Sequence, residues 1–379
     1  MILGIPRSFN TIISFLACQS LTHSARIPSL PRYSFVRCFT STSQLRSYPE
    51  SRITSMSSSS WSELKSISLE KCFLTLSSSN HKGSSGRIGI LGGSAQYTGA
   101  PYYAGMAALQ TGADLVYLFC AQEAASAIKS YSPEIMVLPV YEASKFSSFT
   151  NFDELDEEAT GLISQMVERV VSNLDRLHTL VIGPGLGRCP LVFEATSQIM
   201  LAAMSRDLAL IVDADALFLL TLEKYRGILV NYEKVILTPN IMEYKRLAEA
   251  YGNSKDDPEN IEFLRHIMKG HVIKKGAEDV IIGIDKTSKV MICTEEGGLK
   301  RSGGLGDILA GVLATFLGWQ EILHSRGDPV DWQLACWTAC CVTKRATHAS
   351  FRLRRRAMTA PDVLHEIGSI MIDMERKEE

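Results

Sequence analysis

One stretch of the sequence combines a run of glycines with an acid at the start of an apolar helix. It reads Gly303-Gly-Leu-Gly-Asp307, and an apolar segment follows as far as Trp319. Glycine N–H groups at a helix start can form an anion cradle that stabilises the charge of a transferring phosphoryl group. Asp307 could then be the base that takes a proton from an attacking hydroxyl. Because acids are also favoured early in helices, a purely structural Asp307 stays open.

Two other polar segments follow apolar runs that we expect to be strands. Asp213-Ala-Asp215 places two carboxylates in an apolar context, where they are costly unless paired, hydrogen-bonded or bound to a cation. Asn240 and Glu243 lie three residues apart and therefore on one face of the first turn of a helix. A helix cap explains this second spacing as well as metal or phosphate binding does.

Two further glycine-rich loops, Gly92 to Pro101 and Gly183-Pro-Gly-Leu-Gly187, also close apolar runs. Glycine lets a backbone approach a ligand closely, although an ordinary tight turn is the alternative for both loops. The first loop does not match the dinucleotide fingerprint G-x-G-x-x-G. The chain has no Gly-Lys dipeptide, which excludes a Walker P-loop.

The scaffold that positions these residues reads as an α/β fold. Short, nearly continuous apolar runs alternate with helical stretches, which indicates a mostly parallel central sheet with helices on both faces. Ligands bind such sheets beyond the carboxyl ends of the strands, where all the segments above would lie. The expected strands cover residues 87–91, 115–119, 180–182, 208–212, 234–237, 271–274 and 280–282. The expected helices include residues 102–111 and two closing helices, 334–345 and 360–372, whereas the acid-rich residues 141–175 read as a surface excursion followed by a helix.

The composition fits a globular protein. The 379 residues are 46% hydrophobic and 21% charged with a net charge of −2, which argues against a disordered chain and a strongly basic nucleic-acid binder. No uncharged apolar run reaches the ~18 residues of a membrane span. The cysteines lack paired zinc-ligand spacing, so we expect reduced thiols, with Cys336, Cys340 and Cys341 buried in the core. The basic run 352–356 most simply reads as a solvated segment.

Residues 1–55 differ from the rest in composition. They contain one acid, Glu50, and their arginines occur among many Ser and Thr residues, at Arg7, Arg26, Arg32, Arg37, Arg46 and Arg52. This composition is typical of a mitochondrial transit peptide, with a secretory signal or a disordered tail as alternatives. Met56 offers a second start that would give a cytoplasmic form. We therefore expect residues 56–379 to form the single folded catalytic domain.

Several of these segments, in this order, resemble the ATP-dependent (S)-NAD(P)H-hydrate dehydratases of the ribokinase-like superfamily. The resemblance is carried by residues 86–94, 97–103, 112–115, 129–134, 181–188, 213–215, 237–240 and 303–311. It extends from about Lys82 to the C-terminal helices. The resemblance implies a ribokinase-like fold and a repair reaction, in which ATP drives the return of hydrated NADH or NADPH to the intact cofactor.

The resemblance also implies roles for particular residues. The catalytic group would comprise Asp307 as base with the amides of Gly303, Gly304 and Gly306. The hydrate would contact Ala100, Gly185, Asn240, Ile241, Met242, Glu243, Tyr244, Lys245, Arg246 and Asp307. ATP would contact Lys275, Gly276, Ala277, Glu278, Asp279, Gly297, Gly298, Leu299, Lys300, Arg301, Ser302, Gly303, Gly304, Leu305 and Gly306. Mg²⁺ would bridge the ATP phosphates, with Glu243, and Asp213 or Asp215, holding its waters.

The implied chemistry makes a poor leaving group into a good one. Phosphorylation of the ring hydroxyl lets it depart as phosphate while the ring double bond re-forms. Residues 56–379 carry 33 basic and 40 acidic residues, so they must bind polyanions through local glycine amides, helix N-termini and Mg²⁺. The family that this chain resembles commonly has Gln where this chain has Leu305. The leucine is harmless if only the backbone amides of the loop contact the phosphoryl group.

Two other functions share parts of this pattern. A kinase for a small hydroxymethyl compound would use the same glycine loop and Asp307, but it would release a stable phosphorylated product. A non-catalytic nucleotide-binding protein would not need the base Asp307. We expect small-molecule substrates and no nucleic-acid or membrane partner, and the sequence leaves the oligomeric state open, a homo-oligomer included.

Overall fold

The computed structural model describes residues 56–149, 156–252, 269–284 and 289–376. The expected targeting segment, residues 1–55, lies outside the described residues. Within the described ranges, no helix is both long and apolar enough to cross a membrane.

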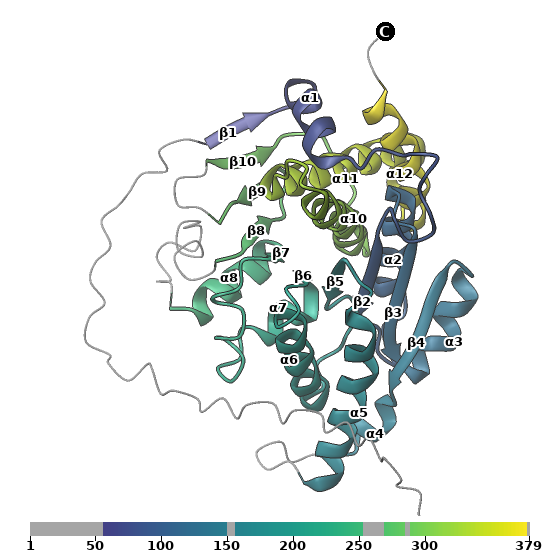
Figure 1. The fold of residues 1–379 in the computed structure, drawn as a ribbon, viewed down its shortest axis with the longest axis vertical. Coiled ribbons are helices and arrows are strands. Elements are labelled where there is room, and N and C mark those ends of the chain that lie inside the picture. The colour runs from purple at the N-terminus through teal and green to yellow at the C-terminus, as the bar shows by residue number, and fades with distance from the viewer. Residues whose placement is uncertain (1–55, 150–155, 253–268, 285–288, 377–379) are drawn as a thin grey trace, which may run out of the picture. The chain divides into compact units, whose positions relative to one another are not determined.

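The described strands form one ten-stranded sheet (Figure 1) in the order β1-β10-β9-β8-β7-β6-β5-β2-β3-β4. The strands are β1 Met56–Ser59, β2 Arg87–Leu91, β3 Leu115–Ala121, β4 Ile135–Tyr141, β5 Thr179–Ile182, β6 Ala209–Val212, β7 Val235–Leu237, β8 His271–Lys274, β9 Asp279–Ile282 and β10 Val290–Cys293. Neighbouring strands are parallel except where β9 pairs with β8 and β10. The prediction of a mostly parallel sheet is therefore confirmed.

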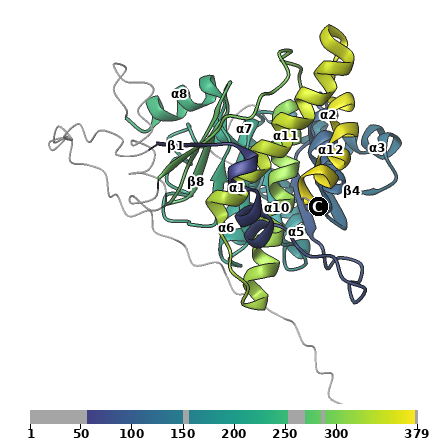
Figure 2. The same ribbon diagram turned by 90° about the horizontal axis from the view of Figure 1, so that it is seen from above.

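Helices cover this sheet on both faces. They are α1 Trp61–Cys72, α2 Gly99–Thr111, α3 Gln122–Tyr131, α4 Ala143–Ser147, α5 Glu157–Leu174, α6 Pro190–Met204, α7 Ala214–Leu219, α8 Ile241–Ala250, α10 Leu305–Arg326, α11 Trp332–Arg354, the 3-10 helix η1 Arg355–Ala357, and α12 Ala360–Glu375. Helix α10 packs on β2, β5 and β6 and also contacts α2 and α11. Figure 2 shows α10, α11 and α12 gathered on one side of the sheet.

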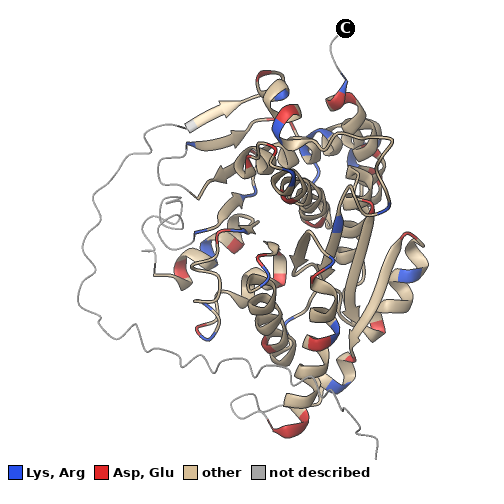
Figure 3. Cartoon of the chain, in the orientation of Figure 1, with Lys and Arg blue, Asp and Glu red and all other residues tan. Residues whose placement is uncertain are grey.

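Burial on two faces explains the strand sequences. Every residue of β5, β6 and β7 is buried, so these strands can be apolar throughout. Figure 3 shows the same division, with charged residues along helices and loops and almost none within the strands. A charge at a strand end is therefore conspicuous.

The strand order reverses between β2 and β5. Strand β2 pairs with β3 on one side and with β5 on the other, although β5 follows β4 in the chain. The loops after β2 and β5 diverge at such a reversal, which is the usual ligand-binding position in open α/β sheets. The loops after β2, β5, β6, β7 and β8 leave the same edge of the sheet, because these strands are parallel.

Several element boundaries differ from the sequence-based expectations. Helix α2 begins at Gly99, so the last residues of the expected loop already form its first turn. Strands β4 and β10 were not expected, nor was β1, whose polar Ser57–Ser59 pair with β10 at the sheet edge, where one-sided hydrogen bonding tolerates polar residues. The basic run 352–356 lies at the end of α11 and in η1, and its residues are exposed, which confirms the expected solvated segment.

The acid-rich segment 141–175 contains the expected helix, α5, and in addition the short helix α4. Strand β4 ends at Tyr141, and α5 buries Ile163, Met166, Val170 and Leu174 against the body of the protein. Two of its acids lie in the first turn, where the positive end of the helix dipole stabilises their negative charges. Residues 150–155, within the same excursion, lie outside the described residues.

The cysteines form no metal site within the described ranges. Cys336, Cys340 and Cys341 are buried in α11, as predicted, and burial raises the pKa of the Cys336 thiol. The Sγ atom of Cys341 lies 3.5 Å from that of Cys293 in β10, and both remain free thiols.

Candidate active site

The glycine loop caps the start of α10. Gly304 is the N-cap residue, with a left-handed φ of 93° that favours glycine. A Cβ atom at Gly304 would come within 2.7 Å of Tyr103 in α2 and 2.8 Å of Ala360 in α12. At Gly303, by contrast, a Cβ atom would meet nothing within 4 Å. The loop is thus pinned at Gly304 and open at Gly303.

A buried ammonium lies beside this loop. Lys275 directly follows β8, and its Nζ donates to Oδ1 of Asp213 at 2.8 Å. The same Nζ would be 3.2 Å from a Cβ atom built on Gly306, so the glycine leaves space for the ammonium. The side chain of Asp213 is 2% exposed, which makes this one of the buried ion pairs of the protein. Breaking such a pair strands an unpaired charge.

Three carboxylates surround Lys275. Burial alone would lower the pKa of Lys275, but Asp213, Glu243 and Asp307 together raise it above its ordinary value. We refer to these four residues, Asp213, Glu243, Lys275 and Asp307, as the charged cluster. Asp213 and Lys275 directly follow β6 and β8, whereas Glu243 and Asp307 lie in the first turns of α8 and α10.

Asp307 has the properties of a general base. Burial, followed by the charge of Asp213, raises its pKa to about 7, although Lys275 opposes the shift. A carboxylate with a pKa near neutrality accepts a proton more readily than an ordinary one, yet it is still ionised in half of the molecules at that pH. The prediction that Asp307 lies in the first turn of a helix is confirmed.

Asn240 and Glu243 form a helix cap. Oδ1 of Asn240 accepts from the N–H groups of Met242 and Glu243, and Oε2 of Glu243 accepts from N–H of Asn240 at 2.8 Å. This is the structural alternative that the spacing allowed. The cap is not the only interaction of Glu243. Burial raises the pKa of its carboxyl and the charge of Lys275 lowers it, so Glu243 also belongs to the charged cluster.

The donor set fits a magnesium ion carried by phosphates better than a protein cage. Among the described residues, no three or more His, Cys, Asp or Glu side chains are arranged to hold a metal. Asp213 is already paired with Lys275, and one oxygen of Glu243 is engaged in the helix cap. Mg²⁺ commonly keeps several waters and binds one or two carboxylates together with substrate phosphates, which this arrangement permits.

Asp215 holds the loop after β5. Its carboxylate accepts from N–H of Gly187 at 3.0 Å and from Nε of Arg188 at 3.1 Å, while the guanidinium of Arg188 lies 4.1 Å from the ring centroid of Phe218. Between Asp213 and Asp215, Ala214 has a φ of 48°. A non-glycine residue in the left-handed region is strained, and such strain concentrates at functional sites.

A small cavity opens between these residues and α8. It has a volume of about 90 Å³ and is lined by Arg188, Ala214, Asp215, Leu217, Phe218, Thr221, Glu243 and Arg246. Two cations and two acids therefore face one cavity at the carboxyl edge of the sheet. Two residues expected on the hydrate side, Glu243 and Arg246, contribute to this lining.

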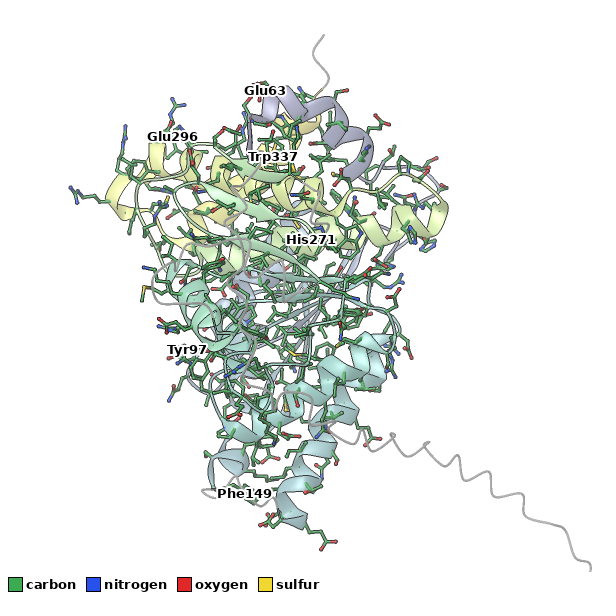
Figure 4. The ribbon with its side chains drawn as sticks, turned by 90° about the vertical axis from the view of Figure 1, so that its left-hand side faces the viewer. Glu63, Tyr97, Phe149, His271, Glu296 and Trp337 are labelled. Atoms are coloured by element: carbon green, nitrogen blue, oxygen red, sulfur yellow. The ribbon has the colours of Figure 1, made fainter. Side chains whose placement is uncertain are left out.

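The two other glycine loops pack against each other. A Cβ atom on Gly92, in the first loop, would lie 2.1 Å from the carbonyl oxygen of Pro184 in the second. The second loop also packs against the residue after β6, because a Cβ atom on Gly183 would lie 1.9 Å from the carbonyl oxygen of Asp213. Gly185 lies against Tyr97 and against Ala100, whose Cβ would be 3.3 Å from a Cβ on Gly185. The structure thus brings Ala100 and Gly185 together, although Figure 4 shows Tyr97 at the molecular margin.

The remaining residues expected near the hydrate are unequally placed. Ile241 and Met242 are 48% and 57% exposed at the start of α8, where a ligand could contact them. Tyr244 is fully buried beneath the helix, with Nζ of Lys274 5.0 Å from its ring centroid. Its side chain therefore supports α8 from within the core instead of facing a substrate.

The residues expected near ATP occupy two neighbouring segments. Gly298 packs against α11, and its N–H donates to Oγ1 of Thr347 in that helix at 3.2 Å. The guanidinium of Arg301 donates to the carbonyl oxygen of Gly298. Glu296, labelled in Figure 4, has its Oε2 3.8 Å from Nδ1 of His348 in α11. Residues 275–278 follow β8 at the same edge, and Asp279 begins β9. Leu299 is 78% exposed between these supports.

Sequence reasoning missed two charged residues next to the site. Arg188 was considered only as part of a glycine motif, yet it pairs with Asp215 and lines the cavity. Lys344 in α11 was not singled out, although it donates to two carbonyls of the segment after β8. A lysine within the apolar run of α11 was the available signal, because lysine is rarely buried without partners.

Comparisons with known proteins agree with this geometry. A family model described as NAD(P)H-hydrate dehydratase matches residues 88–369. A Rattus norvegicus protein named ATP-dependent (S)-NAD(P)H-hydrate dehydratase is 37% identical over 304 residues, which cover 78% of this chain and 80% of the relative. A protein of the same name from Arabidopsis thaliana is 36% identical over 331 residues, covering 85% and 88%.

Solved structures extend the comparison to the fold. A ribokinase-like superfamily protein from Enterococcus faecalis has a TM-score of 0.62 at 20% identity and covers 84% of this chain and 96% of its own. The ADP/ATP-dependent NAD(P)H-hydrate dehydratase from Bacillus subtilis, co-crystallised with ATP and Mg²⁺, has a TM-score of 0.57 at 18% identity, with coverages of 83% and 98%. The expected ribokinase-like fold is confirmed.

Proposed function

The chain belongs to the NAD(P)H-hydrate dehydratase family, and we infer that it is an ATP-dependent hydro-lyase acting on the S epimer of hydrated NADH or NADPH. The observation that carries this assignment is Asp307 at the start of α10, beside Lys275 and the glycine loop, in a chain of this family. The enzyme repairs a nicotinamide cofactor and releases ADP and phosphate.

We propose that Asp307 begins the reaction by removing the proton of the ring hydroxyl. The hydroxyl oxygen attacks the γ-phosphorus of ATP, the bond to the β-phosphate oxygen breaks, and ADP leaves. The amides of Gly303, Gly304 and Gly306 hold the transferring phosphoryl group. Phosphate then departs from the ring with the C–O bonding electrons, a ring proton is lost, and the double bond re-forms. The kinase alternative would stop before this elimination.

Lys275 is suited to act beside these amides. Its ammonium is held by Asp213 at 2.8 Å and lies next to Gly306, so it can stabilise negative charge on the phosphoryl group. The charge is fixed before the substrate arrives, which avoids reorganisation during the reaction. In this proposal the remaining segments expected near ATP, 275–279 and 297–306, hold the rest of the nucleotide.

We propose that Glu243 would help to hold Mg²⁺ beside the ATP phosphates. When bound, it neutralises phosphate charge and orients the phosphate groups. Glu243, through a water, is the residue that would contact it, because one Glu243 oxygen remains after the helix cap is formed. The hydrate would lie against Ala100, Gly185 and the start of α8, in reach of Asp307.

We also propose that residues 1–55 direct the protein to mitochondria and that 56–379 form the catalytic domain. The Arg-rich, acid-poor composition of the first segment supports this proposal. A fusion of residues 1–55 to a fluorescent protein should locate in mitochondria, and a chain that starts at Met56 should remain in the cytoplasm. Secretion of the fusion would instead support the signal-peptide alternative.

The activity has a direct test. The full chain is incubated with ATP, Mg²⁺ and hydrated NADH, and the near-ultraviolet absorbance of the reduced nicotinamide is followed together with phosphate release. We expect absorbance and phosphate to rise in equal molar amounts only when ATP is present. A stable phosphorylated product without recovery of absorbance would indicate the kinase instead, and no turnover by folded protein would refute the assignment.

A further inference from the structure

A buried lysine on α11 is directed at the backbone of another segment. The side chain of Lys344 is 9% exposed, and its Nζ donates to the carbonyl oxygens of Gly276 at 2.8 Å and Ala277 at 2.6 Å. The same Nζ lies 3.5 Å from Oδ1 of Asp279. Lysine is almost never this buried unless its charge is paired, so these three contacts account for its position.

These contacts fix the orientation of two peptide groups. In a planar trans peptide the C=O bond and the N–H bond point in opposite directions. Because the carbonyls of Gly276 and Ala277 point towards the buried Lys344, the N–H groups of Ala277 and Glu278 point away from it. Ala277 and Glu278 are exposed residues. Two successive N–H groups are therefore directed to the outside of the loop, which is an arrangement that binds anions.

The rest of this loop is tethered independently. N–H of Lys275 donates to the carbonyl of Pro239 at 2.8 Å, and N–H of Gly276 donates to Oδ1 of Asp279 at 2.9 Å. Lys275 then continues into the charged cluster through Asp213. A change in the conformation of the loop would thus move an ammonium next to Gly306 as well as the two outward N–H groups.

Lys344 also contacts the second nucleotide segment. A Cβ atom on Gly297 would lie 3.2 Å from Cδ of Lys344, so the aliphatic part of the lysine packs closely against the backbone at residue 297. Both segments expected near ATP, 275–279 and 297–306, are distant from Lys344 in the sequence. They nevertheless both meet this one side chain.

We propose that Lys344 is a positioning residue that orients the N–H groups of Ala277 and Glu278 towards the phosphates of ATP and holds the segment at Gly297 beside them. This inference rests on the proposed function for the identity of the anion, but the arrangement of the loop does not depend on it. Lys344 itself does not contact the nucleotide in this proposal.

The test compares two lysines that are both paired and at least half buried. Lys344→Met removes the donors that hold the loop, and we expect the Kd for Mg²⁺-ATP, measured by calorimetry, and the KM for ATP to rise about tenfold or more. The KM for the hydrate should change by less than about threefold. Lys234→Met is the matched control, because Lys234 pairs with Asp207 and Glu321 at the opposite, amino end of β7 and is 25% exposed. It should lower thermal stability without altering either ATP constant.

Other outcomes decide against the proposal. If Lys344→Met and Lys234→Met both lose stability but keep the wild-type Kd for ATP, Lys344 is merely structural. An equal change in both KM values would lead to the same conclusion. If Lys344→Met does not fold, Lys344→Gln replaces it as the test, because its shorter, neutral side chain cannot reach both carbonyls as the ammonium does. An unchanged Kd for ATP in folded Lys344→Gln would overturn the proposal. Failure of the proposed function is separate, since it would appear as an inactive wild type.

Discussion

The glycine loops after β2 and β5 and the glycine loop before α10 look alike in sequence but differ in their surroundings. In the first two, Gly92 and Gly183 are needed because neighbouring backbones approach to 2.1 and 1.9 Å of where a Cβ atom would lie. In the third, Gly304 packs against the side chains of Tyr103 and Ala360, whereas Gly303 faces open space and Gly306 faces the ammonium of Lys275. Glycine thus permits packing in one region and leaves room for a ligand in the other.

This difference separates stability from activity. Where glycine serves backbone packing, a side chain should harm the fold, because close-packed interiors tolerate overpacking poorly. Where glycine leaves amides accessible, changes should affect catalysis and leave the fold intact. The expected effects of substitutions in the two regions follow this division.

The largest effect is expected at Asp307. Asp307→Asn should lower kcat by about 10²- to 10⁴-fold, the usual contribution of a general base, while the Kd for ATP stays near the wild-type value. The measurement is steady-state kinetics with calorimetric binding of Mg²⁺-ATP. A variant that keeps more than a tenth of the wild-type kcat would show that Asp307 is not the base.

The same substitution should stabilise the protein. The pKa of Asp307 is raised from 3.8 to about 7 in the folded state, so its carboxyl favours folding most below pH 3.8, and this contribution is lost as the pH rises through 7. Asn carries no charge at any pH. The Tm of Asp307→Asn should therefore exceed the wild-type Tm above pH 7, and the difference should shrink towards pH 4. Equal Tm values at pH 8 would contradict the raised pKa.

Gly183 and Gly303 test the comparison most directly. Gly183→Ala should cost about 3 kcal/mol of unfolding free energy, because the new Cβ meets the Asp213 carbonyl and φ is 125°. Gly303→Ala should change it by less than about 0.5 kcal/mol, since a Cβ atom there meets nothing. Urea unfolding of both variants gives the values. Similar losses in the two variants would remove the distinction between the loops.

The pH dependence of the rate should follow Asp307. If the ionised carboxyl is the base, kcat/KM for the hydrate should fall about tenfold for each pH unit below 7 and level off above it. The profile is measured at saturating ATP between pH 5.5 and 9, a range chosen to bracket that pKa. In Asp307→Asn the residual rate should lose this inflection. A wild-type kcat/KM that stays level down to pH 5.5 would mean that the pKa of this carboxyl is not raised in solution.

The smallest effect is expected at Leu305. Leu305→Gln introduces the residue that the resemblance to the family leads us to expect there, and both KM values should change by less than about twofold if the loop acts through its backbone amides. Steady-state kinetics for ATP and for the hydrate provide the measurement. A large gain in the rate would show that a side chain at this position also contacts the substrate.

Periodicity and strand-end chemistry predicted the central part of this protein well. The buried strands β2, β5, β6 and β8 are apolar enough to be read directly, and their parallel order brings the loops to one edge. Strand β1 escaped detection because Ser57–Ser59 lack apolar alternation, and only pairing with β10 makes them a strand. The charged cluster was predicted as separate acids, but the ion pair of Asp213 with Lys275 joins residues 62 positions apart. Such a contact leaves no local pattern.

The edge strand β1 has a consequence for how the protein matures. Met56 pairs opposite Val290, and N–H of Trp61 donates to Oε1 of Glu295, so the first residues after the proposed targeting segment are already part of the fold. Proteolytic removal of that segment beyond residue 59 would delete the strand and expose the unpaired backbone edge of β10, a template for aggregation. The mature N-terminus, determined by mass spectrometry, should therefore lie at or before Met56. The sheet, as well as the import machinery, sets where processing must stop.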